Sequence, residues 1–209
     1  MQFIKPFRIA LAGFVAIILF GMTVECRAVT APAEQTAVFA GGCFWGVEAV
    51  FRHVRGVSEV VSGYAGGAAE KANYEAVSTG RTGHAESVRI AFDPARVSYR
   101  QLLEVFFTVA HDPTQLNRQG PDFGTQYRSV IFYSSPEQQA QAKSFIDRLT
   151  VARSFSSPIV TQFLPLKQFY PAEKHHQNYL ASHMDQPYII INDLPKLEQL
   201  RKKFPSLYK

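Results

Sequence analysis

The spacing of hydrophobic and polar residues changes several times along the chain, and each change predicts a different element. Residues 36–40 form a short apolar run that ends at Gly41 and Gly42, which predicts a strand. In "FWGVEAVFRHV", which follows, apolar residues recur at the spacing of one helix face, so we expect a helix that begins near Cys43. Alternation returns in "ESVRIAF", which predicts a strand with one buried side.

Capping residues mark the helices further along the chain. Ser98 and Gln101 make a capping-box pattern ahead of the apolar segment "LLEVFFTVAHD", and Ser135 before Pro136 predicts a helix that ends near Thr150. Strands are predicted for "GVSEVVSGYA", "YRSVIFY" and "PIVTQF". The later segment "LKQFYPAEKHHQNYLASH" is aromatic and typical of a loop, with a short helix expected after its proline.

These elements follow the order β-α-β-β-α-β-α-β. We therefore predict one domain over residues 29–209, of the α/β (α+β) class: a two-layer sandwich in which helices pack on a mixed sheet, with a ferredoxin-like core. Two long segments, 66–81 and 112–126, are rich in Gly, Pro, Asn and Asp. Loops of that length in a compact domain are often functional, so we expect these two segments to be functional loops.

The N-terminal residues have a different composition. Basic residues precede an apolar run over 9–22, which is shorter than the roughly 20 residues that a membrane-spanning helix needs. Small residues at Cys26 and Ala28 suit cleavage, so residues 1–28 are predicted to be a signal peptide that directs the chain to the periplasm. An uncleaved anchor facing the periplasm is the alternative. Glu25 argues against a lipoprotein site at Cys26.

The chain as a whole has the composition of a globular protein, with 46% hydrophobic and 19% charged residues. The formal charge is +5, and loss of residues 1–28 would remove three cations and one anion and leave +3. So small a charge argues against a nucleic-acid partner, since the basic residues are scattered apart from the "RKK" run at 201–203. A monomer is the default expectation.

Cysteine usage draws attention to one residue. The chain has two cysteines, and cleavage after Ala28 would leave only Cys43. One cysteine cannot form an internal disulfide, so Cys43 is either a small buried hydrophobe or a free reactive thiol.

The neighbours of Cys43 favour the reactive alternative. A thiol at the start of a helix faces unpaired N–H groups and the positive end of the helix dipole, and we expect both to favour the thiolate near neutral pH. Gly41 and Gly42 are expected to turn the backbone sharply and to leave space for a molecule to approach the sulfur. Phe44 and Trp45, the chain's one tryptophan, can form an apolar wall for a small alkyl group, although such a pair also serves as plain packing.

Four blocks of the sequence resemble those of a known enzyme family. "GGCFWGVE", "NYEAVSTGRTGHAESVRIAFDP", "QGPDFGTQYRSVIFY" and "FYPAEKHHQNYL" are similar, in the same order, to blocks of the A-type peptide methionine sulfoxide reductases. The resemblance covers residues from about Ala37 to Leu207. It implies reduction of the S epimer of methionine sulfoxide, in oxidised proteins or as the free amino acid, without a metal or organic cofactor.

The resemblance also implies roles for the residues around the cysteine. Cys43 would attack the sulfoxide sulfur, while Phe44 and Trp45 would hold the terminal methyl group of the substrate. A sulfoxide is a poor electrophile until its oxygen accepts a proton, so the site must supply an acid or strong hydrogen-bond donors at that oxygen.

Glu86 matches the family's acidic residue, and partial burial would give it the raised pKa that a proton donor needs. Tyr74 and Tyr127 match two tyrosines that hydrogen-bond the same oxygen. Asp122 matches an aspartate that orients the site, and His176 matches a histidine that lies near that aspartate and is expected to contact the substrate. Taken alone, Glu86 is an ordinary strand-end residue, the tyrosines are ordinary half-buried core, and Asp122 is a turn residue. A zinc site is not expected, because adjacent histidines point in different directions and no further ligand completes a familiar spacing.

The chain departs from many members of the family in lacking a second cysteine for the catalytic cycle. Ser78 stands at one position where such a cysteine occurs, and the C-terminal segment has none. We therefore expect the sulfenic acid on Cys43 to be reduced by an external thiol, from a thioredoxin-like protein or a small molecule. If residues 1–28 stay attached, Cys26 is an alternative partner.

Two other functions remain open at this point. Cys43, His176 and Asp122 could instead serve a cysteine acyl-transferase or hydrolase, because a thiolate, an imidazole and a carboxylate also support acyl chemistry. A non-catalytic protein could use the aromatic pair to bind oxidised, methionine-rich segments. Of these three alternatives, we predict the reductase.

Overall fold

The computed structural model describes residues 1–3 and 33–209. Nearly all of the predicted signal peptide, including Cys26, lies outside the described residues. In the described part of the chain, no helix is both long enough and apolar enough to span a membrane. The strands are β1 (Gln35–Ala40), β2 (Val57–Ala65), β3 (Ala85–Phe92), β4 (Arg118–Gln119), β5 (Asp122–Phe123), β6 (Val130–Tyr133), β7 (Gln162–Pro165) and β8 (Phe169–Pro171), and the helices are α1 (Phe44–Arg52), α2 (Tyr74–Val77), α3 (Tyr99–Val105), α4 (Pro136–Val151), α5 (Tyr179–Ser182) and α6 (Leu194–Lys203).

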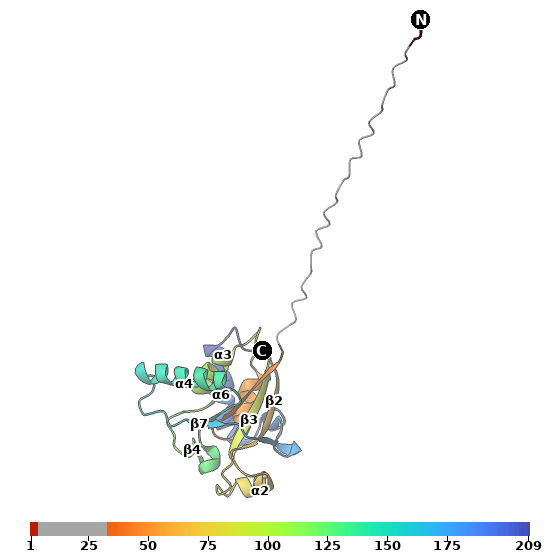
Figure 1. Cartoon of the computed structure of the whole chain (residues 1–209). Coiled ribbons are helices and arrows are strands. Elements are labelled where there is room, and N and C mark those ends of the chain that lie inside the picture. Colours follow the sequence, from red (N-terminus) through yellow and green to blue (C-terminus); the bar gives the residue numbers. More distant parts are fainter. Residues whose placement is uncertain (4–32) are drawn as a thin grey trace. The chain divides into compact units, whose positions relative to one another are not determined.

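Six of the strands form one mixed sheet in the order β7-β6-β1-β3-β2-β8 (Figure 1). All neighbouring pairs in it are antiparallel except β6 and β7, which are parallel. The four central strands, joined through α1 and α3, have the order expected of a ferredoxin-like core, which confirms the predicted fold class. Strands β4 and β5 form a separate hairpin in the predicted loop 112–126.

The main core lies between one face of the sheet and the helices. Phe39 and Ile90 from the sheet share one buried cluster with residues of α1, α3, α4 and α6, such as Phe51 and Leu102. Because side chains alternate along a strand, Val38 and its equivalents on the other strands form a second cluster on the opposite face. The helices therefore make up one layer and the sheet the other.

The predicted capping residues are in place at the helix starts. The Ser98 side chain accepts a hydrogen bond from the Gln101 N–H, and the Gln101 side chain accepts one from the Ser98 N–H, which completes a capping box at α3. The Ser135 side chain accepts a bond from the Gln138 N–H, and Pro136 is the first residue of α4. These local bonds determine where the two helices begin.

Two elements near the sheet edges differ from the prediction. The strand predicted over 158–163 begins only at Gln162, because Val160 donates its N–H to Pro113 in the 112–126 loop and is tied there instead of to β6. Strand β8 was not predicted, since its three residues are too few to show a period. It pairs with the end of β2 and so brings the segment that follows it towards α1.

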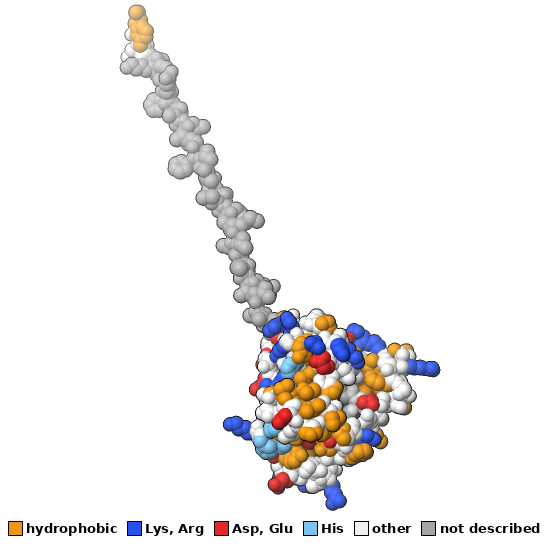
Figure 2. Space-filling view, turned by 180° about the vertical axis from the view of Figure 1, so that it is seen from behind, with side chains coloured by type: hydrophobic (Ala, Val, Ile, Leu, Met, Phe, Trp, Pro, Cys, Tyr) orange, Lys and Arg blue, Asp and Glu red, His pale blue; other side chains and the backbone are white. Residues whose placement is uncertain are grey.

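Several large apolar side chains remain exposed on the surface. Figure 2 shows hydrophobic side chains gathered over the middle of one face, with Lys and Arg side chains towards its margin. Grouped apolar surface marks interaction sites more often than single exposed residues do. The most exposed within residues 33–209 include Leu116, Phe123, Val151, Met184, Ile190 and Ile191.

Candidate active site

Cys43 lies at the start of α1, as predicted. It is the N-cap residue, its side chain makes no capping hydrogen bond, and only 8% of its surface is exposed. Gly42 precedes it with a φ of 93°, which a residue with a side chain rarely adopts. The space beside this turn is not left for substrate, contrary to our expectation: a Cβ on Gly42 would lie 2.5 Å from Cγ of Gln119, and one on Gly41 2.8 Å from Cγ of His111.

Glu86 lies against the same helix start. Its side chain is 2% exposed on β3, and its Oε2 accepts the backbone N–H of Phe44 at 3.1 Å. Burial raises the pKa of Glu86 to about 8, Asp122 adds to that shift, and the bond from Phe44 opposes it. Glu86 is therefore mostly protonated at neutral pH, the state that a proton donor requires.

The protonation state of Cys43 corrects our expectation of a thiolate at rest. Burial raises the pKa of the thiol well above its ordinary value, and the carboxylates of Glu86 and Asp193 raise it further. A hydrogen bond from the Trp45 N–H favours the thiolate, as expected at a helix start, but it does not outweigh the burial. Cys43 thus rests as a protonated thiol.

A cavity of about 70 Å³ reaches Cys43 from the surface. The loop residues from Gln119 to Asp122 line it, together with Tyr188, Asn192 and Lys196. Oδ2 of Asp122 accepts the hydroxyl of Tyr188 at 2.5 Å. Burial raises the pKa of Asp122, while that hydrogen bond and the Lys196 ammonium oppose the shift.

Aromatic rings form the neighbouring wall of the site. The ring of His176 lies 4.5 Å from Tyr74, 5.3 Å from Phe44 and 5.9 Å from Trp45, measured between centroids. Nε1–H of Trp45 donates to Nδ1 of His176 at 3.3 Å, so the histidine proton is on Nε2. Burial lowers the pKa of His176 and keeps it neutral. Its buried Nε2 has no hydrogen-bond partner among the described residues, which leaves this donor available to a bound molecule.

The two tyrosines approach the site from different segments. Tyr74 is the first residue of α2, and Tyr127 ends a 3₁₀ turn over Thr125–Tyr127. Burial raises the pKa of both phenols, and the Glu86 carboxylate raises it further in each, which places both hydroxyls within the electrostatic reach of that group. Both therefore remain protonated at neutral pH and can donate hydrogen bonds.

Comparison with known proteins decides the family. The family model for peptide methionine sulfoxide reductase matches residues 35–207, which is more than half of the chain. The chain belongs to the peptide methionine sulfoxide reductase family. This reductase family converts the S epimer of methionine sulfoxide to methionine, and that is the activity of the chain. The predicted resemblance is confirmed.

Individual relatives agree with the assignment. The chain is 58% identical over 178 residues to peptide methionine sulfoxide reductase MsrA 2 of Mesorhizobium japonicum, covering 85% of this chain and 91% of that protein. It is 59% identical over 144 residues to MsrA of Acidobacterium capsulatum, covering 69% and 92%.

Two solved reductase structures share the fold. Mxr1 of Saccharomyces cerevisiae in its reduced form has a TM-score of 0.69 and 33% identity, covering 73% of this chain and 87% of that one. Methionine sulfoxide reductase A of Corynebacterium diphtheriae has a TM-score of 0.64 and 35% identity, covering 73% and 76%. The fold class is therefore that of the reductases.

Several residues around the reductase site were not predicted. Tyr188 and Lys196 lie after the last matched block, which ends at Leu180, and no pattern pointed to them. Gln119 is the first residue of the matched block "QGPDFGTQYRSVIFY" and lies in the loop 112–126, but no role was assigned to it. In the described part of the chain, no three His, Cys, Asp or Glu side chains are placed to hold a metal ion. The ring of His183 instead stacks on the ring of Tyr179, with 3.7 Å between their centroids.

Proposed function

We propose that reduction begins with attack of the Cys43 sulfur on the sulfoxide sulfur while Glu86 protonates the sulfoxide oxygen. The attack forms an S–S bond between Cys43 and the substrate. The protonated oxygen then passes from the substrate sulfur to the Cys43 sulfur while the substrate S–O bond and the S–S bond break, so methionine leaves and Cys43 becomes a sulfenic acid. The proton of the thiol replaces the one that Glu86 gives up, so no proton is gained or lost overall. The observation that carries this proposal is the buried, protonated Glu86 carboxyl held against the first N–H of the helix that Cys43 caps.

Binding is assigned to the groups around these two residues. Tyr74 and Tyr127 donate hydrogen bonds to the sulfoxide oxygen, which develops charge as its bond to sulfur breaks. Phe44 and Trp45 hold the methyl group on their rings, and His176 keeps Trp45 in place through its Nδ1. Asp122, held by Tyr188, lines the cavity at Cys43 and orients the substrate there.

The cycle is completed by an external thiol. Residues 29–209 contain no cysteine besides Cys43, so no resolving thiol exists in the chain once residues 1–28 are removed. A thiol of a thioredoxin-like protein, or a small thiol, attacks the sulfenic acid, releases water and forms a mixed disulfide. A second thiol then releases Cys43 as the free thiol, and the reductant leaves as its own disulfide.

The acyl-transfer alternative loses support from the hydrogen bonds of the site. His176 Nδ1 accepts from Trp45, and Asp122 accepts from Tyr188. Neither residue is bonded to the other or to Cys43, so the described residues contain no relay that would activate the thiol for acyl transfer. The binding-only alternative is separated from catalysis by Cys43→Ser, which would keep affinity and lose turnover.

Export to the periplasm is part of the proposal. It is supported by the basic start and the short apolar run of residues 1–28, and it places the reductant outside the cytoplasm. A chain that keeps these residues would be anchored there instead.

One measurement tests the cycle and the cleavage together. Protein released from the periplasm is given one equivalent of the S sulfoxide of a blocked methionine with a sulfenic-acid trap, and its intact mass is recorded. We expect a chain that begins at Val29, one trapped adduct, and one equivalent of methionine product. Cys43→Ser is the control and should yield neither adduct nor product. An internal disulfide with Cys26 in place of the adduct would contradict the single-cysteine cycle.

A further inference from the structure

The chain that follows His176 is held to the sheet by a side chain that the mechanism does not use. Gln177 accepts the N–H of Ser62 at 2.9 Å through Oε1, and its Nε2 donates to the carbonyl oxygens of Ser62 at 2.9 Å and Ala172 at 3.0 Å. At Ser62 in β2, the side-chain amide of Gln177 thus makes the two backbone hydrogen bonds that a neighbouring strand would make. The backbone on either side of Gln177 is fixed relative to the sheet as a result.

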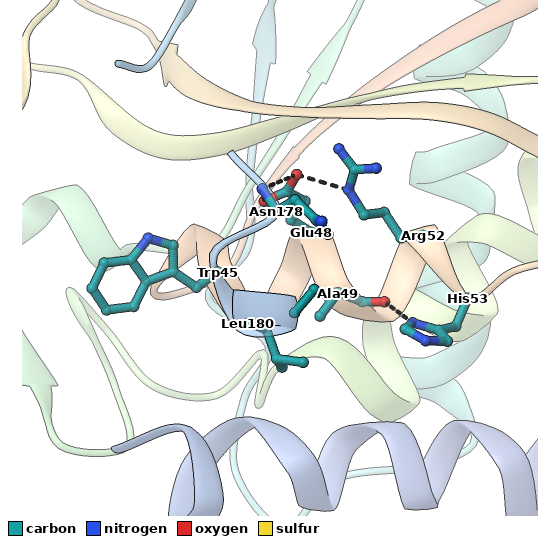
Figure 3. A pocket seen from close by; sticks show the side chains of 8 residues that line it. Trp45, Glu48, Ala49, Arg52, His53, Asn178 and Leu180 are labelled. Carbon is teal, nitrogen blue, oxygen red and sulfur yellow. Dashed lines mark hydrogen bonds and ion pairs between the residues drawn. The ribbon is translucent and has the colours of Figure 1, made fainter. Parts of the chain in front are cut away.

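A second attachment comes from α1 itself. The Glu48 carboxylate is buried, and both of its oxygens lie 2.9 Å from the backbone nitrogen of Asn178. Oε1 also accepts Nε–H of Arg52 at 2.9 Å, and Oε2 accepts the hydroxyl of Ser62 at 3.0 Å. Figure 3 shows Glu48 between Arg52 and Asn178 on one side of α1, with the indole of Trp45 at the end of the same helix. Asn178 has a φ of 52°, so the backbone of this residue is in the left-handed conformation.

This anchored backbone carries two of the rings that contact Trp45. His176 precedes it and bonds the indole N–H at 3.3 Å, and Tyr179 follows it and stacks on the indole with a centroid separation of 3.7 Å and an angle of 8°. Trp45 and Glu48 are three residues apart on α1, so they are neighbours on the helix surface. The rings that fix the indole thus depend on a backbone that Glu48 holds.

We propose that Glu48 is a positioning residue that fixes the plane of Trp45 by anchoring the His176–Tyr179 segment to α1. Its loss weakens the binding of the sulfoxide methyl group and leaves the chemical step at Cys43 almost unchanged. The binding part of this proposal rests on the proposed role of Trp45, whereas the placement of the indole does not.

The site requires a carboxylate and not merely a polar side chain. Three donors, from Arg52, Ser62 and Asn178, converge on the two oxygens, and an ionised carboxylate is acceptor-only. In Glu48→Gln the amide has the same shape but must direct its NH₂ group to one of the two positions. Both oxygens of Glu48 contact the Asn178 N–H, so the NH₂ group of the glutamine faces that N–H whichever oxygen it replaces. Two donors then face each other, and the bond that anchors Asn178 is weakened.

The test uses the fluorescence of Trp45, the one tryptophan of the chain. In Glu48→Gln we expect a shifted emission maximum and stronger quenching by acrylamide, because the indole is freed from Tyr179 and His176. The KM for a blocked methionine S-sulfoxide should rise roughly tenfold, while the single-turnover rate at saturating substrate changes by less than about twofold.

Arg52→Gln is the matched control. It removes one donor from the same carboxylate and leaves the contact with Asn178, so it should lower stability without changing the emission or the KM. Gln177→Ala is a second test, needed if Glu48→Gln does not fold. It removes the attachment to Ser62, and we expect the same changes in emission and KM as in Glu48→Gln.

The outcomes separate this inference from the proposed function. Unchanged emission in a folded Glu48→Gln protein, or in Gln177→Ala where Glu48→Gln does not fold, would overturn the positioning role, and so would the same change in Arg52→Gln. A changed emission with an unchanged KM would support the positioning role and instead contradict the methyl pocket assigned to Trp45.

Discussion

The two ends of α1 differ in how completely their polar groups are paired. At the first end, Cys43 caps the helix without a side-chain bond, and the Phe44 N–H is bonded to a buried carboxyl. At the other end, the chain after the helix pairs with the C-terminal residues. The Arg55 N–H donates to Leu207 at 2.6 Å, and the Lys209 N–H donates to His53 at 2.9 Å. At the end near His53 the backbone groups are paired with other parts of the chain, whereas at the end near Cys43 the thiol has no side-chain capping bond.

The same contrast appears in the unpaired buried atoms. Among the described residues, five side chains have a buried polar atom without a partner, and two of them, His176 and Asp193, lie beside the first half of α1. None belongs to residues 53–57 or 204–209. An unpaired buried group costs about 1–3 kcal/mol, so the end of α1 near Cys43 carries a cost that the other end does not.

The largest expected effect is at the first end of the helix. Glu86→Gln should slow sulfenic-acid formation about 10²–10⁴-fold, because the amide cannot protonate the sulfoxide oxygen. In the unsubstituted protein the rate should fall as the pH rises through about 8, where Glu86 loses its proton. Stopped-flow single turnovers across pH 6 to about 10 would measure both. Glu137→Gln, an exposed substitution on α4 with the same charge change, should leave the rate unaltered.

The same carboxyl should make stability depend on pH. The folded-state pKa of Glu86, about 8, lies above its ordinary value of 4.5, so the folded chain binds the proton more tightly than the unfolded chain. The stabilisation is complete below pH 4.5 and is lost as the pH rises through 8, by up to about 5 kcal/mol. Urea unfolding at pH 5 and 9 should show a larger loss in the unsubstituted protein than in Glu86→Gln, in which Cys43 and Asp122 still contribute a pH dependence. An equal pH dependence in both would contradict the assignment.

The smallest effect on activity is expected at the end near His53. Removal of Tyr208 and Lys209 eliminates the bond to His53, the bond from Arg55 Nε to the Tyr208 carbonyl and the bond from Lys209 Nζ to Val57. We expect the free energy of unfolding to fall by about 2 kcal/mol, with kcat/KM unchanged at temperatures where the chain is folded. Urea unfolding measures the first and steady-state kinetics the second. Arg201→Ala, which breaks an exposed ion pair on α6, should change neither. A loss of kcat/KM in the fully folded truncated protein would show that the two ends are coupled.

Much of the fold was predictable because its signals are local. The capping residues Ser98 and Ser135 sit in sequence beside the helices that they start, and alternation in "ESVRIAF" identified a central strand. The strand predicted over 158–163 was wrong at its start because Val160 is held by a loop about 45 residues earlier in the chain, and no local pattern contains that contact.

The position of Cys43 at a helix start was predictable from the sequence, and the electrostatics around it were less so. The sequence indicated the helix start at Cys43 and the block that contains Glu86. It could not show that Asp193, 150 residues further along, packs against the same helix, where a Cβ on Gly46 would lie 2.1 Å from its Oδ1. Burial and that carboxylate reverse the expected acidity of the thiol, and both depend on tertiary packing.

The protonated resting state of Cys43 has a consequence for the survival of the enzyme under oxidising conditions. Peroxides and alkylating agents react with thiolates far faster than with thiols, so a sulfur that keeps its hydrogen is largely inert towards them. On the proposed mechanism, the sulfur reacts when a sulfoxide fills the cavity and engages Glu86. The burial that raises the pKa of Cys43 thereby lowers its reactivity towards oxidants that do not bind there.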